Sequence, residues 1–198
     1  MSFVETAGNW CECRVALTTS ENWLVLDLVS EEPEAWAQEV AEQHLAGDSS
    51  AESRRAFAED LLWYWGAAVR QRAVCAALLA PPNGAILASY TVRELKAPPE
   101  TLSMEVLRAE AAHAEGPFFG KPALTEVELP LGSALRVHRF EPTVPDTDTS
   151  TILEGVAHYV LPRDYLTLLE CRLLWTTLGL GEELGRIADE LANSVRLV

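Results

Sequence analysis

Basic residues are scarce in this sequence. The 198 residues include 15 Lys and Arg against 30 Asp and Glu, a formal net charge of −15, and only Lys96 and Lys121 are lysines. Nucleic-acid backbones and anionic lipid surfaces are bound by neutralising their charge with Lys and Arg. The composition therefore argues against both kinds of partner, and we expect neither a nucleic-acid nor a membrane interaction.

Long apolar runs are also missing. The longest, Ala73–Pro82, is far short of the ~20 residues that span a bilayer. The first residues, Met1 to Trp10, carry no basic cluster and no apolar run of the kind that marks a secretion signal. We therefore expect a cytoplasmic protein.

Cysteine is too sparse for a disulfide framework. Four cysteines in a chain of this length are typical of reduced, buried thiols: Cys11, Cys13, Cys75 and Cys171. Cys11 and Cys13 have the spacing of half a thiolate metal site or a redox pair, but no second Cys or His pair lies at ligand spacing. The sequence predicts no metal site.

The length and the absence of Gly/Ser linkers or repeats predict a single domain over residues 1–198. Its charge is uneven: residues 1–60 hold 13 acidic and 3 basic side chains, a net charge of −10. Only residues 141–150 have a linker-like composition, and we interpret them as a long loop between two strands.

Apolar spacing predicts mixed secondary structure. Residues 9–17 and 22–29 are expected to form a hairpin, followed by one helix capped by Ser30 and a second capped by Ser49 and running to Arg72. Further strands are expected at 73–79, 85–93, 123–129, 134–140, 152–161 and 165–175, with helices at 102–114 and 182–195.

Helices placed before and after a run of hairpin-linked strands favour an α+β fold, a mainly antiparallel β-sheet flanked by helices in an α/β/α sandwich. The glycines Gly179, Gly181 and Gly185 sit between the last strand and the last helix, where dinucleotide-binding turns occur. Their spacing is GxGxxxG, Glu182 and Glu183 occupy the anion position, and no second βαβ unit follows. The sequence therefore predicts no cofactor.

Three predicted strands each place two polar residues on one face: Arg136 with His138, Glu154 with His158, and Glu170 with Arg172. If these strands pair in sequence order, one patch can bind a carboxylate or act as an acid/base site. Cross-strand ion pairing on a partly solvated face is the other interpretation. The candidate contact residues in the patch are Arg136, His138, His158, Glu170 and Arg172.

Phe118 and Phe119 are bracketed by Gly and Pro in a helix-to-strand connection. They are either a protruding partner contact or a plug at one end of the core.

The order of elements resembles the PsbP-like family, which includes the Ran-binding Mog proteins and bacterial LpqN-type proteins. The C-terminal segment carries most of the resemblance: a strand from Gly155 to Leu161, the turn Pro162-Arg163-Asp164, a strand from Tyr165 to Trp175, and a helix closing in NSVRL. The long helix from Ala51 to Arg72 and the missing lipoprotein leader depart from that pattern. The resemblance implies an α/β/α sandwich with a non-catalytic adaptor or binding role.

No catalytic signature such as GxSxG is present. We therefore expect a non-enzymatic interaction module, of an adaptor, chaperone-like or immunity type, whose acidic N-terminal third attracts a basic protein partner. The alternative is a small-ligand-binding protein or an enzyme that uses the polar strand patch. Homodimerisation is a further hypothesis.

Overall fold

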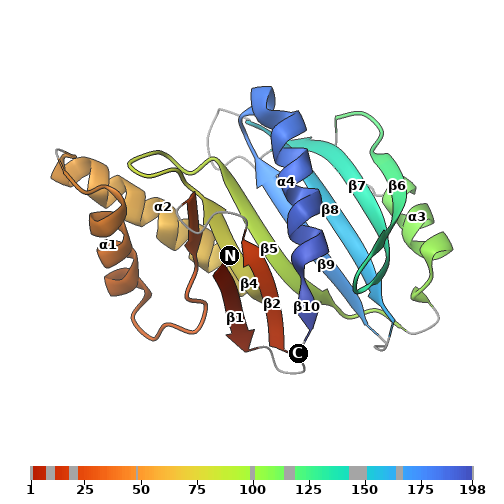
Figure 1. Cartoon of the computed structure of the whole chain (residues 1–198). Helices are drawn as coiled ribbons and strands as arrows, with labels where there is room; N and C mark the ends of the chain where they lie inside the picture. Colours follow the sequence, from red (N-terminus) through yellow and green to blue (C-terminus); the bar gives the residue numbers. More distant parts are fainter. Residues whose placement is uncertain are drawn as a thin grey trace.

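Two antiparallel sheets form the centre of the computed structural model (Figure 1). The structure describes residues 2–7, 12–17, 22–47, 49–98, 101–113, 119–142, 151–163 and 167–197. The large sheet has seven strands in the order β3-β4-β5-β9-β8-β7-β6. These strands are β3 Trp23–Val25, β4 Ala73–Leu79, β5 Ala88–Leu95, β6 Ala123–Leu129, β7 Gly132–Pro142, β8 Ile152–Pro162 and β9 Leu168–Trp175.

The small sheet has the order β1-β2-β10, with β1 Ser2–Ala7, β2 Glu12–Leu17 and β10 Arg196–Leu197. It lies on the same face of the large sheet as α4, Gly181–Ser194 (Figure 1). The buried residues of α4 recur at Leu184, Ala188 and Leu191, the spacing of one helical face, and pack into the largest core together with Val15 of β2.

The opposite face carries the other three helices, α1 Pro33–His44, α2 Ala51–Arg70 and α3 Met104–His113. Helices α1 and α2 pack together and cover the β4 end of the sheet, and α3 covers β7 and β6 (Figure 1). A separate core lies under each group, one around Phe57 and Leu61 and one around Leu107 and Leu135. The α+β class and the flanking helices are therefore confirmed.

The predicted first hairpin is wrong. Residues 12–17 pair with Ser2–Ala7, for which the sequence predicted neither a strand nor a helix. Strand β3 joins the large sheet instead, through the pair Trp23↔Leu79. Alternating apolar residues specify which face of a strand is buried but not which strand lies beside it. The buried strand β4 needs a neighbour on each edge, and β3 and β5 supply them.

Two predicted helix caps are also misplaced. Helix α2 is capped by Ser50, whose side chain accepts a hydrogen bond from the Ser53 N–H at 3.0 Å. The N-cap residue of α1 is Glu32. The Ser30 hydroxyl accepts a hydrogen bond from the Glu32 N–H in the turn before the helix. Both errors are displacements of one or two residues among neighbouring capping candidates.

The loop expected at 141–150 begins later, because residues 141 and 142 are the last of β7, and residues 143–150 lie outside the described residues. None of the described helices combines the length and the apolar character needed to cross a membrane. Cys75 and Cys171 are buried in the largest core. Cys11 and the side chain of Cys13 are outside what the structure describes.

Candidate functional site

The sheet divides the five predicted polar residues between its two faces. Strands β7, β8 and β9 are neighbours, as expected, and Arg136 pairs with His158, which pairs with Cys171. Successive residues of a strand point to opposite faces. Glu170 and Arg172 therefore lie on the face opposite to His158, and the single patch is replaced by two clusters.

The first cluster lies under α4. Asp189 of α4 accepts hydrogen bonds at one carboxylate oxygen, Oδ1, from Arg136 Nε at 2.7 Å and His158 Nε2 at 3.0 Å. His158 is 2% exposed, and its other ring nitrogen, Nδ1, is buried and has no hydrogen-bond partner among the residues that the structure describes. Helix α4 thus supplies the carboxylate that joins two strand residues.

A second carboxylate in this cluster is held by a histidine and a tryptophan. Glu154 of β8 is buried and accepts hydrogen bonds from His138 Nε2 at 2.8 Å and from Trp175 Nε1 at 2.9 Å. It lies at the first residue of α4, where a Cβ on Gly181 would come within 2.7 Å of both carboxylate oxygens. The absence of a side chain at Gly181 lets the carboxylate approach the positive end of the helix.

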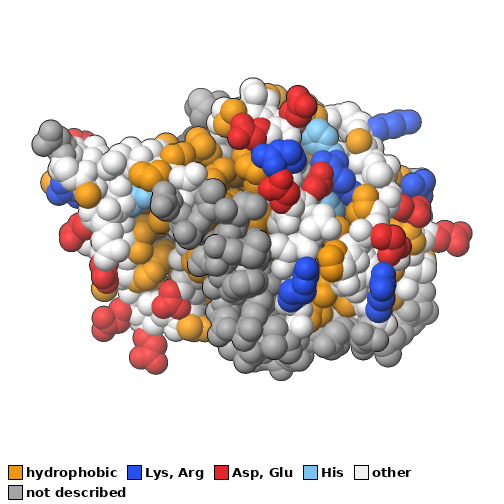
Figure 2. Space-filling view, in the orientation of Figure 1, with side chains coloured by type: hydrophobic (Ala, Val, Ile, Leu, Met, Phe, Trp, Pro, Cys, Tyr) orange, Lys and Arg blue, Asp and Glu red, His pale blue; other side chains and the backbone are white. Residues whose placement is uncertain are grey.

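A cleft of about 500 Å³ opens over this cluster. We call it the α4 cleft; it is lined by Arg136, His138, Glu154, Val156, Leu178, Gly181, Glu182, Gly185, Arg186 and Asp189. Figure 2 shows basic, acidic and histidine side chains gathered over α4 and the adjoining strands. The cleft therefore presents hydrogen-bonding groups of both signs beside an exposed leucine, Leu178.

The hydrogen bonds alter the titration of Asp189. Burial acts to raise the pKa of this carboxyl, but the bonds from His158 and Arg136 and the arginine charge outweigh burial and hold the pKa below its usual value of 3.8. Asp189 is therefore a carboxylate at neutral pH and a fixed hydrogen-bond acceptor for His158. Chemically, the cleft offers one histidine–carboxylate pair, His138 with Glu154, and the carboxylate of Asp189, an arrangement suited to hydrogen bonding with a polar ligand.

The second cluster, on the opposite face, is built on arginine. Glu170 is 1% exposed and is paired with Arg93 of β5. Burial acts to lower the pKa of Arg93, but the hydrogen bond and charge of Glu170 outweigh it and raise that pKa. Burial, followed by the charge of Glu170, raises the pKa of Tyr159. The raised pKa values keep Arg93 protonated and Tyr159 neutral at neutral pH.

Arg172 belongs to the same face but has a different partner. Its guanidinium donates to Glu141, which is also 3.5 Å from Arg139 Nε. Both arginines are largely shielded from solvent. This part of the face is an ion-pair network that joins β7 and β9.

The two predicted phenylalanines are only partly described. Phe118 lies outside the described residues. Phe119 is 52% exposed, and its N–H donates to the carbonyl of Phe140 at 3.0 Å. Its side chain is therefore available at the surface and does not plug a core, while its role as a partner contact stays a prediction.

Sequence reasoning missed Asp189, Trp175 and Glu141 as members of these clusters. Asp189 follows the buried Ala188 on the amphipathic helix, so the sequence does indicate that Asp189 borders the buried stripe. Which strand residues it meets depends on how α4 crosses the sheet, and one sequence does not specify that crossing. Within the described part of the chain, no group of three His, Cys, Asp or Glu side chains is arranged to hold a metal ion.

Comparisons with protein-family models, curated proteins and solved structures give no significant match to this chain. The resemblance to the PsbP-like family stays a prediction.

Proposed function

We propose that the chain is a non-catalytic protein-interaction module that binds a basic protein partner through an acidic surface on α1 and the turn before it. No Lys or Arg occurs between residues 15 and 53. The described carboxylates of this surface are all exposed: Asp27, Glu31, Glu32, Glu34, Glu39 and Glu42. We call these six residues the α1 acidic surface.

The α1 acidic surface is uncompensated, and this single observation supports the proposal most. Among the described residues, the pairs elsewhere join Arg or His to Glu or Asp, but none includes a member of this surface. Figure 2 shows the acidic side chains around α1 at the lower left, with few basic ones among them. Uncompensated charge of one sign accelerates association with a partner of the opposite sign.

An exposed apolar residue lies beside the α1 acidic surface. Val29 is 78% exposed in the turn before α1. The turn is held in place because Asp27 Oδ1 accepts from the Val29 N–H at 3.3 Å and the Asp27 carbonyl accepts from Trp65 Nε1 of α2 at 2.7 Å. A surface that is already ordered loses less conformational entropy on binding.

The test compares two matched double variants. Glu34→Gln with Glu39→Gln removes two charges from α1, and Glu105→Gln with Glu110→Gln removes two exposed charges from α3, with one residue of each pair in the first helical turn. A partner is captured from native extract with the wild type, purified, and its association rate measured at low and physiological salt.

We expect the α1 variant to slow association about tenfold at low salt and to weaken its salt dependence, with a smaller effect of the α3 variant. Equal effects of the two variants, or association that does not respond to salt, would refute the α1 acidic surface as the binding site.

The α4 cleft favours a second candidate function, the binding of a small polar ligand. Its volume of about 500 Å³ falls within the roughly 300–1,000 Å³ of small-molecule sites, and Arg136 and His138 both line it.

The experiment is a thermal-shift screen of small organic acids and amines against the wild type, His138→Gln and the exposed control His113→Gln. A ligand of the cleft raises the Tm of the wild type and of His113→Gln but not of His138→Gln. Equal shifts in all three proteins, or no shift with any compound, contradict this function.

A further inference from the structure

A cavity between α2 and the large sheet lies apart from both surfaces discussed so far. It has a volume of about 180 Å³. Protein interiors hold few voids larger than a water molecule, and an engineered apolar cavity of ~150 Å³ binds benzene. The cavity is therefore large enough for a small organic molecule.

Small side chains on both walls create the cavity. Helix α2 presents Ala67 and Ala68, and strand β5 presents Ser89 and Thr91. Larger residues at these positions would fill the space between the helix and the sheet. The cavity therefore results from the small side chains at these four positions.

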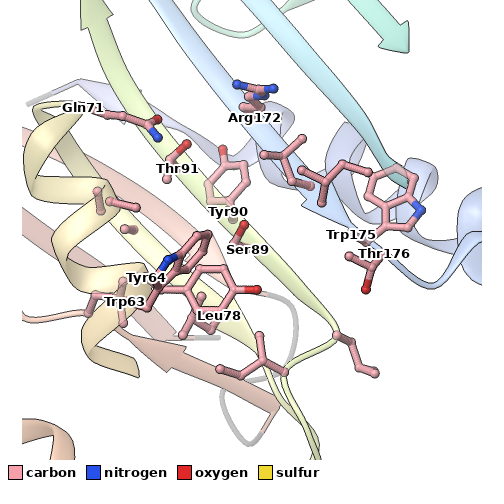
Figure 3. Close-up of a pocket in the computed structure, with 18 residues that line it drawn as sticks. Trp63, Tyr64, Gln71, Leu78, Ser89, Tyr90, Thr91, Arg172, Trp175 and Thr176 are labelled. Atoms are coloured by element: carbon pink, nitrogen blue, oxygen red, sulfur yellow. The ribbon is translucent and has the colours of Figure 1, made fainter. Parts of the chain in front are cut away.

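The two ends of the cavity differ in polarity. In Figure 3, Trp63, Tyr64 and Leu78 lie toward one end, and Gln71, Thr91 and Arg172 lie toward the other. Trp63 is 64% exposed and meets Tyr64 edge-on, with ring centroids 4.9 Å apart. An aromatic wall at the surface is suited to an apolar ligand body.

Arg172 is the one charged residue among the described residues that line the cavity. It pairs with Thr91 across β5 and β9, so the guanidinium and the threonine hydroxyl belong to neighbouring positions. One of its nitrogens donates to Glu141. A guanidinium has five N–H donors, so further donors remain for an anionic ligand group.

A carboxylate at the aromatic end gives the ligand a direction. Asp60 lies one helical turn before Tyr64 on α2, and its charge adds to burial in raising the pKa of Tyr64. A ligand carboxylate is repelled from that end, and at the other end it competes with Glu141 for the donors of Arg172. The apolar body then lies between the alanines of α2 and the aromatic side chains.

We propose that this cavity binds a small carboxylic acid with an aromatic or branched apolar body of about seven non-hydrogen atoms, a size set by comparison with benzene in ~150 Å³. Its carboxylate pairs with Arg172 and its body fills the space over Ala67. The site is independent of the proposed protein partner, since none of its described lining residues belongs to the α1 acidic surface.

Isothermal titration with 3-phenylpropanoate and with 3-phenylpropan-1-ol tests the site, because the two probes share the apolar body and differ in charge. We expect the acid to bind the wild type at least about tenfold more tightly than the alcohol, since hydrogen bonds to charged groups are roughly twice as strong as neutral ones. Equal affinity for the two probes, or binding of neither, overturns the proposal.

Four variants locate the binding. Ala67→Leu fills the cavity and should weaken both probes at least tenfold, whereas Ala56→Leu, at an exposed position on the same helix, should change neither. Arg172→Gln should abolish the preference for the acid. Glu141→Gln should preserve or increase that preference, because it removes the anion that competes for Arg172. Binding unaffected by Ala67→Leu, or an acid preference that survives Arg172→Gln, refutes the assignment.

Discussion

The two faces of strands β7, β8 and β9 carry ionisable clusters made from different side chains. On the α4 face, Asp189 and Glu154 accept hydrogen bonds from His158 and His138. On the opposite face, Glu170 and Glu141 are paired with arginines. The same strands build both clusters, because alternate residues serve alternate faces.

The two clusters differ in what surrounds them. Arginine stays protonated and donates to carboxylates in a fixed geometry, so the arginine cluster acts as an ionic brace within the sheet. The histidine cluster has a cleft of about 500 Å³ over it, and its carboxylates Glu154 and Asp189 line that cleft.

The largest expected effect comes from removing the buried charge of the arginine cluster. Glu170→Gln leaves Arg93 without its ion pair and should lower the free energy of unfolding by about 3 kcal/mol, the low end of the range for breaking a buried pair because Arg93 is partly exposed. Urea unfolding followed by circular dichroism measures this loss.

Glu154→Gln is the matched change on the α4 face, and it should cost only about 1 kcal/mol, because a glutamine oxygen still accepts from Trp175. Glu126→Gln, in an exposed pair with Arg108, serves as the control and should change stability by less than about 0.5 kcal/mol. Similar losses for Glu170→Gln and Glu154→Gln would remove the expected difference in stability between the arginine cluster and the histidine cluster.

Two glycines of α4 give the next effect in size. Gly181→Ala places a Cβ within 2.7 Å of the Glu154 carboxylate and should destabilise by about 1–2 kcal/mol through overpacking. Gly185→Ala meets its nearest neighbour, Arg136 Nη2, at an ordinary 3.6 Å and should stabilise by up to about 1 kcal/mol through helix propensity. Thermal unfolding compares the Tm of each variant with that of the wild type. A higher Tm for Gly181→Ala would show that Glu154 is not fixed at the start of α4.

A smaller effect concerns pH. The folded-state pKa of Asp189 is lowered, so its contribution is fully present above its unfolded pKa and is lost as pH falls through the folded value. The difference in unfolding free energy between the wild type and Asp189→Asn should therefore be largest above the usual carboxyl pKa of 3.8 and shrink as the pH falls through the lower folded-state value. Urea unfolding across that range tests the sign, and a difference that grows on acidification would contradict it.

The smallest effect is spectroscopic. The charge of Glu170 contributes, after burial, to the raised pKa of Tyr159. In Glu170→Gln, ultraviolet titration should show one tyrosine ionising at a lower pH than in the wild type, though still above its usual range because burial remains. An unchanged titration curve would place Tyr159 outside the electrostatic reach of Glu170.

The fold class was predictable because it depends on local signals. The apolar stripe of α4 is present in the structure, and the strands predicted at 134–140 and 152–161 lie within β7 and β8. The partner of β3 was not predictable, because its short apolar segment fits against any buried strand that offers a free edge.

The candidate site was predictable only in part for a related reason. Sequence order correctly made β7, β8 and β9 neighbours, which brought Arg136 next to His158. The relative register of adjacent strands decides which residues share a face, and a shift of one residue separates His158 from Glu170. The α4 carboxylate Asp189 comes from a helix distant in sequence, so only tertiary packing places it.

The small sheet has a consequence for the order of folding. Strand β2 pairs with β1 on one edge and with β10 on the other, so Arg14 lies opposite Arg196. During synthesis β1 and β2 leave the ribosome early, but their sheet is incomplete until β10 follows nearly the whole intervening chain. Pairings between such distant residues slow folding because a long loop must close first. We therefore expect β1 and β2 to be the last part of the described fold to become protected from hydrogen exchange, although they are made before β10.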